Sequence, residues 1–171
     1  MRSTKRLVML SVIVAVGMVL SYIEALMPPF VAIPGVKLGL ANTATVFALY
    51  MLGVSDAALV SILRVTLSSM LFGSTLSLFY SLVGALFSFA IMLVCRYALR
   101  FSPIGVSALG GVFHNLGQTV TAAIVLKSLG VFFYFPVLII SGILAGVLIG
   151  TVSGIIVKRF EKSFRMSKMQ R

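Results

Sequence analysis

The stretch Gly110-Gly111-Val112-Phe113-His114-Asn115-Leu116-Gly117-Gln118-Thr119-Val120-Thr121-Ala122 decides the fold, because it is apolar enough for a membrane and carries the one histidine. In a helix, about 100° of rotation per residue places His114, Gln118 and Thr121 in one row, with Asn115 beside it. The opposite side of this helix is apolar and can face lipid. Since water is absent at that depth, each polar group in the row needs a partner from the protein or from a ligand. The row is therefore the leading candidate for a binding site.

The composition of the whole chain is typical of an integral membrane protein. Of the 171 residues, 60% are hydrophobic and 10% are charged, and the mean hydropathy is +1.18. A soluble domain needs more polar side chains than this to cover its surface. We therefore expect an all-α, polytopic helix bundle. The length leaves room for about six spans of roughly 20 residues and for no separate soluble domain.

Breaks at charged residues, proline and glycine divide the chain into six predicted transmembrane helices within a single domain, 1–171. The second and third runs are at most about 24 Å long, against a hydrocarbon core of about 30 Å. They are either two short spans or one re-entrant hairpin. The predicted spans are 7–27, 38–52, 57–72, 75–95, 106–126 and 135–157, followed by a basic cytoplasmic tail at 158–171.

The basic residues account for a formal net charge of +11. A nucleic-acid-binding protein would gather them on one solvated face, whereas here most of them lie at both ends of the chain and around 96–100. Such flanking clusters are what the positive-inside bias produces, with anionic lipid headgroups as counterions. We therefore predict a multi-pass protein of the cytoplasmic membrane with both termini cytoplasmic. Its partners include membrane lipids and exclude nucleic acid.

A few further polar side chains lie at membrane depth. Arg64, in the middle of the third run, keeps its proton and needs an anion, carbonyl groups or water. Glu24 forms an ion pair with Lys37 that holds the proline-rich loop at 28–37 in place, or else it contacts a ligand directly. Asn42 either orients a ligand or links two helices. For His114 the alternative to a ligand is a hydrogen bond to a backbone carbonyl.

Small residues recur at a spacing of four on two of the predicted helices, which allows close helix packing. On the last span, four glycines form a continuous row, which we expect to pack inside the bundle; the alternative is a docking surface for another membrane subunit. On the first span, Ser11 and Ala15 form a weaker row, for which internal packing and docking of another membrane subunit are both open. The four glycines of the last span are Gly142, Gly146, Gly150 and Gly154.

The sequence contains no recognisable catalytic motif. It has no glycine-rich phosphate loop and no H-E-x-x-H pattern. Its three acidic residues lie far apart in the sequence and indicate neither a Ser-His-acid site nor clustered magnesium ligands. The single cysteine, Cys95, allows no internal disulfide and no metal cage. We therefore expect no self-contained enzyme, no catalytic residue, no cofactor and no metal.

Three segments of the chain resemble one known family. They are Pro34-Gly35-Val36-Lys37-Leu38-Gly39-Leu40-Ala41-Asn42, the pattern from Arg64 through Phe72-Gly73, Ser77-Leu78 and Tyr80-Ser81-Leu82 to Gly84, and Gly105-Val106-Ser107 with Gly110 and His114-Asn115-Leu116-Gly117-Gln118. Together they resemble the Gx transporter family, which is often labelled heptaprenyl diphosphate synthase component I. This family is similar to the substrate-binding S components of energy-coupling factor transporters.

The resemblance implies a six-helix, S-component-like subunit that captures a small vitamin-like or prenyl-type molecule. Such a subunit relies on a transmembrane coupling subunit with ATPases. S components commonly dock through an Ala-x-x-x-Ala pattern on the first helix, where this chain has Ser11 and Ala15. Lys37 and Arg64 favour an anionic group on the ligand. The residues implied to line the site are Lys37, Asn42, Arg64, His114, Asn115 and Gln118.

Two other functions fit the same sequence. The first is a non-catalytic membrane accessory, component I of a heptaprenyl or polyprenyl diphosphate synthase or of a quinone-related pathway. The second is a purely structural scaffold, which would tolerate apolar replacements of the polar row. The sequence leaves open which small molecule is bound and whether ATP drives its uptake.

Overall fold

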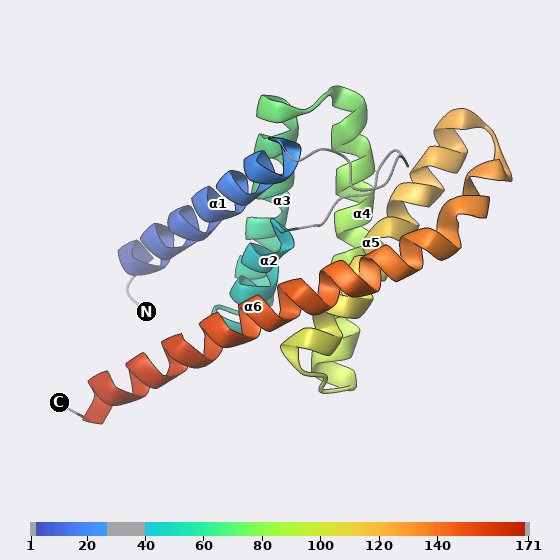
Figure 1. Cartoon of the computed structure of the whole chain (residues 1–171). Helices are drawn as coiled ribbons and strands as arrows, with labels where there is room; N and C mark the ends of the chain where they lie inside the picture. Colours follow the sequence, from blue (N-terminus) through green and yellow to red (C-terminus); the bar gives the residue numbers. More distant parts are fainter. Residues whose placement is uncertain (1–2, 27–39, 170–171) are drawn as a thin grey trace.

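The computed structural model describes residues 3–26 and 40–169, and the regular elements in these ranges are all helical, which confirms the all-α prediction. Successive helices run in opposite directions, so the start of α1 and the end of α6 lie at the same end of the bundle (Figure 1). The elements are α1 (Ser3–Leu26), α2 (Asn42–Met51), α3 (Val54–Phe72), α4 (Thr75–Leu93), the π-helix η1 (Val94–Ala98), α5 (Pro103–Leu126), the 3-10 helix η2 (Leu129–Tyr134) and α6 (Phe135–Met169).

Five of the described helices are long and apolar enough to cross a membrane, and α2 is not among them. With 10 residues, α2 is about 15 Å long, half the thickness of the hydrocarbon core. The helix after it, α3, has 19 residues and begins at Val54 rather than at 57. The predicted runs 38–52 and 57–72 therefore form an unequal pair, one short helix and one of spanning length. Between them, Gly53 takes φ 106°, which favours glycine.

The last helix extends further than the apolar pattern indicates. α6 contains 35 residues and ends at Met169, so most of the predicted tail at 158–171 continues the helix. Lysine and arginine have good helix propensity, and a charged stretch therefore ends a membrane run without ending the helix. α5 begins earlier than the predicted span 106–126. Its first residue is Pro103, and the hydroxyl of Ser102 just before it accepts a hydrogen bond from the Gly105 amide.

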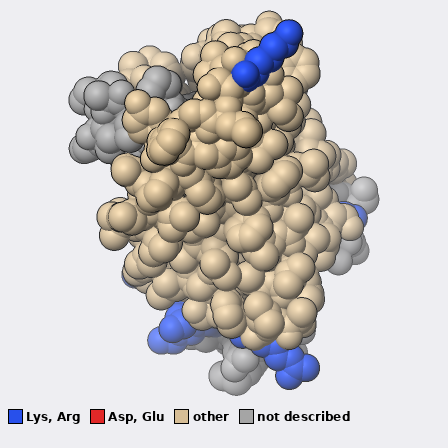
Figure 2. Space-filling model, turned by 90° about the vertical axis from the view of Figure 1, so that its right-hand side faces the viewer, with Lys and Arg blue, Asp and Glu red and all other residues tan. Residues whose placement is uncertain are grey.

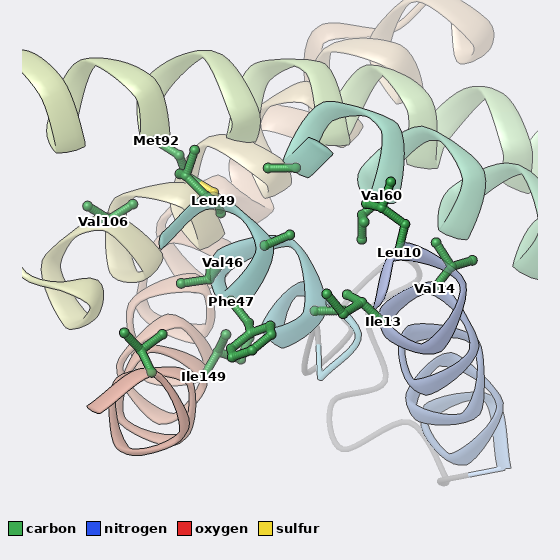
Figure 3. Close-up of a cluster of buried hydrophobic side chains, with 14 of the residues drawn as sticks. Leu10, Ile13, Val14, Val46, Phe47, Leu49, Val60, Met92, Val106 and Ile149 are labelled. Atoms are coloured by element: carbon green, nitrogen blue, oxygen red, sulfur yellow. The ribbon is translucent and has the colours of Figure 1, made fainter. Parts of the chain in front are cut away.

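The helices form two groups that meet around α2. In the first group α1 packs on α2 and α3, and in the second α5 packs on both α4 and α6. Contacts of α2 with α6 and of α3 with α4 join the groups. Figure 3 shows Val46, Phe47 and Leu49 of α2 surrounded by apolar side chains from neighbouring helices. Burial on all sides stabilises a helix that is too short to cross the membrane.

The glycines of the last span lie against α5. Gly142 contacts the backbone of Gly111, and a Cβ placed on Gly146 would lie 2.5 Å from the Cα of Ala108. The contact loosens toward the end of the row, since a Cβ on Gly154 would have its nearest neighbour at 3.7 Å. This row therefore lies inside the bundle and brings the two backbones close together.

The small residues of α1 have a different position. Ser11 and Ala15 are exposed, and the Ser11 hydroxyl donates a 3.0 Å hydrogen bond to the carbonyl of Leu7 in its own helix. The other side of the helix is occupied, because Ile13 and Val14 belong to the buried cluster in Figure 3. The Ser11 and Ala15 face of α1 thus lies on the outer surface of the described bundle.

The surface has the charge distribution of a membrane protein. On the face in Figure 2, basic residues lie at the two ends and a broad uncharged belt separates them. Large apolar side chains are exposed on the helices, and Leu86 and Leu144 are each 67% exposed. These features indicate a multi-pass membrane protein, while the cytoplasmic position of the termini stays a prediction.

Candidate functional site

A cavity of about 300 Å³ lies where the two groups of helices meet. All six α-helices contribute to its wall. The larger apolar side chains in the wall are Val65, Phe72 and Ile149, and the other apolar positions are alanine or glycine. The polar lining residues are Ser21, Glu24, Asn42, Arg64, Ser68, Ser69, Ser77, Ser81, His114 and Asn115.

Arg64 is the buried cation of this cavity. Its side chain extends from the middle of α3, the residue is only 7% exposed, and its Nη2 donates a 2.8 Å hydrogen bond to Oδ1 of Asn42. Its Nε is also buried and has no hydrogen-bond partner among the described residues. On α1, Gly17 leaves room for the side chain, because a Cβ there would lie 2.9 Å from Cδ of Arg64. The guanidinium is thus held in place while part of its donor capacity remains available.

Glu24 supplies the carboxylate of the cavity. It lies in the last turn of α1, is partly buried, and interacts electrostatically with Arg64. Lys37 lies outside the described residues, and so does the predicted Glu24–Lys37 ion pair. Within the described part of the wall, the charged side chains are therefore Glu24 and Arg64, one of each sign.

The polar row predicted on α5 divides between two environments. His114 and Asn115 line the cavity, but Gln118 is buried and does not line it. The reason is the close contact of α5 with α4, where a Cβ on Gly117 would lie 2.9 Å from the Cα of Gly84. One turn from His114, the two backbones leave no space for a ligand, and Gln118 packs beside Gly84.

Asn115 connects two helices as well as lining the cavity. Its Nδ2 donates a 2.7 Å hydrogen bond to the carbonyl of Leu138 and lies 3.4 Å from the Ser141 hydroxyl, both on α6. A side-chain amide that satisfies a carbonyl of a neighbouring helix stabilises the α5–α6 pair. The donor side of Asn115 is therefore used by the protein, and a role toward a ligand stays a prediction.

Sequence reasoning missed the serines of the cavity. Ser77 and Ser81 lie one turn apart on α4, so their hydroxyls share one face, and Ser68 and Ser69 come from the last part of α3. The Ser68 hydroxyl is buried without a hydrogen-bond partner among the described residues. The spacing of four between Ser77 and Ser81 was the available signal. Serine can bond to a carbonyl of its own helix, so its presence in a span is weak evidence for a site.

A second polar contact lies outside the cavity, at the end of the bundle that holds the termini. Asp56, buried in the first turn of α3, accepts hydrogen bonds of 3.0 Å at both carboxylate oxygens from Nε of Arg6. Nη2 of Arg6 completes the bidentate ion pair. The pair attaches the start of α1 to the start of α3, a contact that the sequence pattern did not predict.

The chemistry of the cavity favours recognition of a polar ligand. It offers a guanidinium, a carboxylate, an imidazole, two amides and several hydroxyls around one space. The described residues contain no cluster of three or more His, Cys, Asp or Glu that could hold a metal ion. Cavities with a few fixed polar groups are the usual form of a small-molecule site.

Comparison with known proteins gives one match. The family model described as heptaprenyl diphosphate synthase component I matches residues 13–156. This range includes every described lining residue of the cavity. Neither the curated proteins nor the solved structures contain a match to this chain.

Proposed function

Because the chain belongs to the heptaprenyl diphosphate synthase component I family, we propose that it is a membrane-embedded, non-catalytic subunit that binds a small molecule for import. In this proposal the ligand occupies the cavity between the two groups of helices. Among the described residues, Arg64, Asn42, His114 and Asn115 contact it. Partner subunits supply the energy for its release to the cytoplasm.

The observation that carries this proposal is that Arg64 is buried with an unbonded Nε among the described residues. A guanidinium buried at membrane depth loses its hydration, and the loss amounts to several kcal/mol unless hydrogen bonds and an opposite charge replace the water. Asn42 supplies one neutral acceptor, while Nε has none among the described residues. An anionic group in the adjoining cavity would add acceptors for the guanidinium beyond the Asn42 oxygen.

The shape of the wall supports binding over a scaffold role. A scaffold needs its polar side chains to bond one another in a filled interior. Here hydroxyls and amides from several helices surround a space of about 300 Å³, and at least Ser68 and Arg64 keep unused donors among the described residues. Polar groups kept at this depth without protein partners favour a ligand.

The source of energy is proposed to be a transmembrane coupling subunit with ATPases. The chain has no glycine-rich phosphate loop of its own. The exposed face of α1 with Ser11 and Ala15 supports such a partner, since small residues allow another helix to approach closely. Docking at α1 would leave the α5–α6 contact intact.

The proposal is tested by binding and uptake together. Purified protein in lipid nanodiscs should retain a small molecule that native mass spectrometry detects, and Arg64→Gln should lose it. Arg159→Gln, at an exposed position of α6, is the matched control and should retain it. Cells that express the chain with its partners should accumulate the same molecule. If Arg64→Gln retained the molecule as fully as wild type, the cavity would not be the site.

The description of the matching family favours a second candidate, an accessory to a prenyl diphosphate synthase. In that case the chain recruits a catalytic component to the membrane, and the exposed helix surfaces matter more than the cavity. Affinity purification should then recover a soluble synthase in stable stoichiometry. Uptake should be absent, and Arg64→Gln should leave synthase recruitment unchanged.

A further inference from the structure

We propose that the ligand is a compact zwitterion with one carboxylate and one protonated amine, and that polyprenyl diphosphates are not accepted. This inference rests on the proposed function, in which the cavity is the ligand site. It extends that function by naming the substrate class. Three features of the described wall support it: its charge balance, the positions of its charges and its polarity.

The charge balance comes first. Arg64 and Glu24 are the charged side chains of the described wall, and together they are electrically neutral. At membrane depth an added net charge is expensive unless an opposite charge accompanies it. A zwitterion adds no net charge and can pair with both side chains. A diphosphate adds several negative charges beside a carboxylate, with a single guanidinium among the described residues to neutralise them.

The positions of the two charges provide separate contacts for the two ends of such a ligand. Arg64 lies in the middle of α3, about two helical turns, or roughly 12 Å along the axis, before Phe72 at the end of that helix. Glu24 lies in the last turn of α1, at the same end of the bundle as Phe72 (Figure 1). The ligand carboxylate therefore binds Arg64 at the deep end, and its amine lies toward Glu24. A carboxylate offers about four acceptor positions, so Glu24 can accept from the amine alongside its existing interaction.

Hydroxyls interrupt the apolar part of the cavity wall. Ser68, Ser77 and Ser81 supply three of them, whereas a prenyl chain needs a continuous apolar lining. The volume of about 300 Å³ is at the lower end of the range of roughly 300–1,000 Å³ for small-molecule sites. It suits a compact molecule and not a chain of heptaprenyl length.

Equilibrium dialysis with defined variants tests this assignment. Wild type, Arg64→Gln, Glu24→Gln and the control Arg159→Gln, each in nanodiscs, are dialysed against the small-molecule extract of the source cells, and mass spectrometry identifies the enriched compounds. We expect an enriched compound with both a carboxylate and an amine. Its enrichment should fall at least tenfold in both cavity variants and stay unchanged in Arg159→Gln.

The outcomes separate this inference from the proposed function. An enriched compound that depends on Arg64 but is phosphorylated, lacks an amine or ignores Glu24→Gln overturns the zwitterion assignment and leaves the cavity as a ligand site. Absence of any Arg64-dependent enrichment overturns both. Farnesyl diphosphate is the second probe, and saturable binding that Arg64→Gln abolishes likewise overturns the assignment. Thermal unfolding of each variant, with Arg64→Lys as the variant that keeps the charge, distinguishes loss of binding from loss of folding.

Discussion

Nη2 of Arg64 donates a 2.8 Å hydrogen bond to Oδ1 of Asn42, and this bond joins the middle of α3 to the first residue of α2. It places the start of the short helix at the depth of the buried cation. The same bond fixes one side of the guanidinium, while Nε is buried without a hydrogen-bond partner among the described residues.

The first prediction concerns the occupant of the Arg64 site. Asn42→Asp places a carboxylate where the amide oxygen now lies, and the resulting ion pair should compete with an anionic ligand. We expect ligand retention to fall at least tenfold with no loss of thermal stability. Asn42→Ala should reduce retention less than Asn42→Asp and lose about 1.5 to 3 kcal/mol of stability, the usual contribution of a hydrogen bond to a charged group. Full retention by Asn42→Asp would contradict the assigned role of Arg64.

The second prediction tests how α1 positions Arg64. A Cβ on Gly17 would lie 2.9 Å from Cδ of Arg64 and 3.1 Å from Cβ of Ala44, so a larger side chain must displace the arginine. Gly17→Leu should therefore reduce ligand binding at least tenfold in dialysis, and Gly17→Ala should reduce it less. Ala15→Leu, on the exposed side of the same helix, is the control and should bind as wild type does. Equal binding by all three variants would exclude this packing.

The third prediction concerns the ion pair of Arg6 and Asp56. Because Asp56 is buried and its carboxylate is held by two nitrogens of Arg6, removing either partner should lower the unfolding temperature. A double-mutant cycle with Arg6→Gln and Asp56→Asn should show that the second change adds little to the first. Lys5→Gln, an exposed neighbour, should have no effect. Strictly additive single effects would show that the two residues do not interact.

The fourth prediction compares two glycines in the same row of α6. Gly146→Ala places a methyl group 2.5 Å from the Cα of Ala108, where only backbone could move, and should destabilise the fold by about 1 to 3 kcal/mol. Gly154→Ala meets its nearest atom at 3.7 Å and should be neutral or slightly stabilising. Unfolding in mild detergent measures both changes. Similar stabilities would mean that α5 and α6 are not in close contact at Gly146.

The fifth prediction separates partner docking from ligand binding. Ala15→Phe adds bulk to the exposed small-residue face of α1, so it should strongly reduce uptake in cells that contain the partner subunits. Ligand retention by the purified chain should be unchanged, because this face points away from the buried cluster. Leu144→Phe, at an exposed apolar position of α6, is the matched control. Normal uptake by Ala15→Phe would place the partner elsewhere.

Much of the fold followed from the sequence alone, and the reason is the membrane. Without water to bond the backbone, a chain this apolar must form helices, and its breaks at proline, glycine and charge mark where they end. The boundaries at Phe72, Thr75 and Leu126 follow from this pattern. The end of α6 does not, because helix propensity continues where hydrophobicity stops.

The contents of the cavity were only partly predictable. Arg64 and His114 attract attention in a sequence because such side chains are costly in a membrane. Gln118 belongs to the same helical row, yet the contact of Gly84 with Gly117 closes the space beside it. The serines at 68, 77 and 81 gave little signal, because hydroxyls can be satisfied locally in any helix.

The sequence by itself determined that this chain is a bundle of apolar helices with rare polar groups inside. Both properties follow from the free energy of transferring each residue from water to lipid. Only the tertiary structure decided which polar groups meet. Arg6 pairs with Asp56, 50 positions away along the chain, and Arg64 meets Asn42 and His114 around one cavity. Partners of this kind are fixed by the crossing of helices and by the places where glycine lets backbones approach, which periodicity within one helix does not specify.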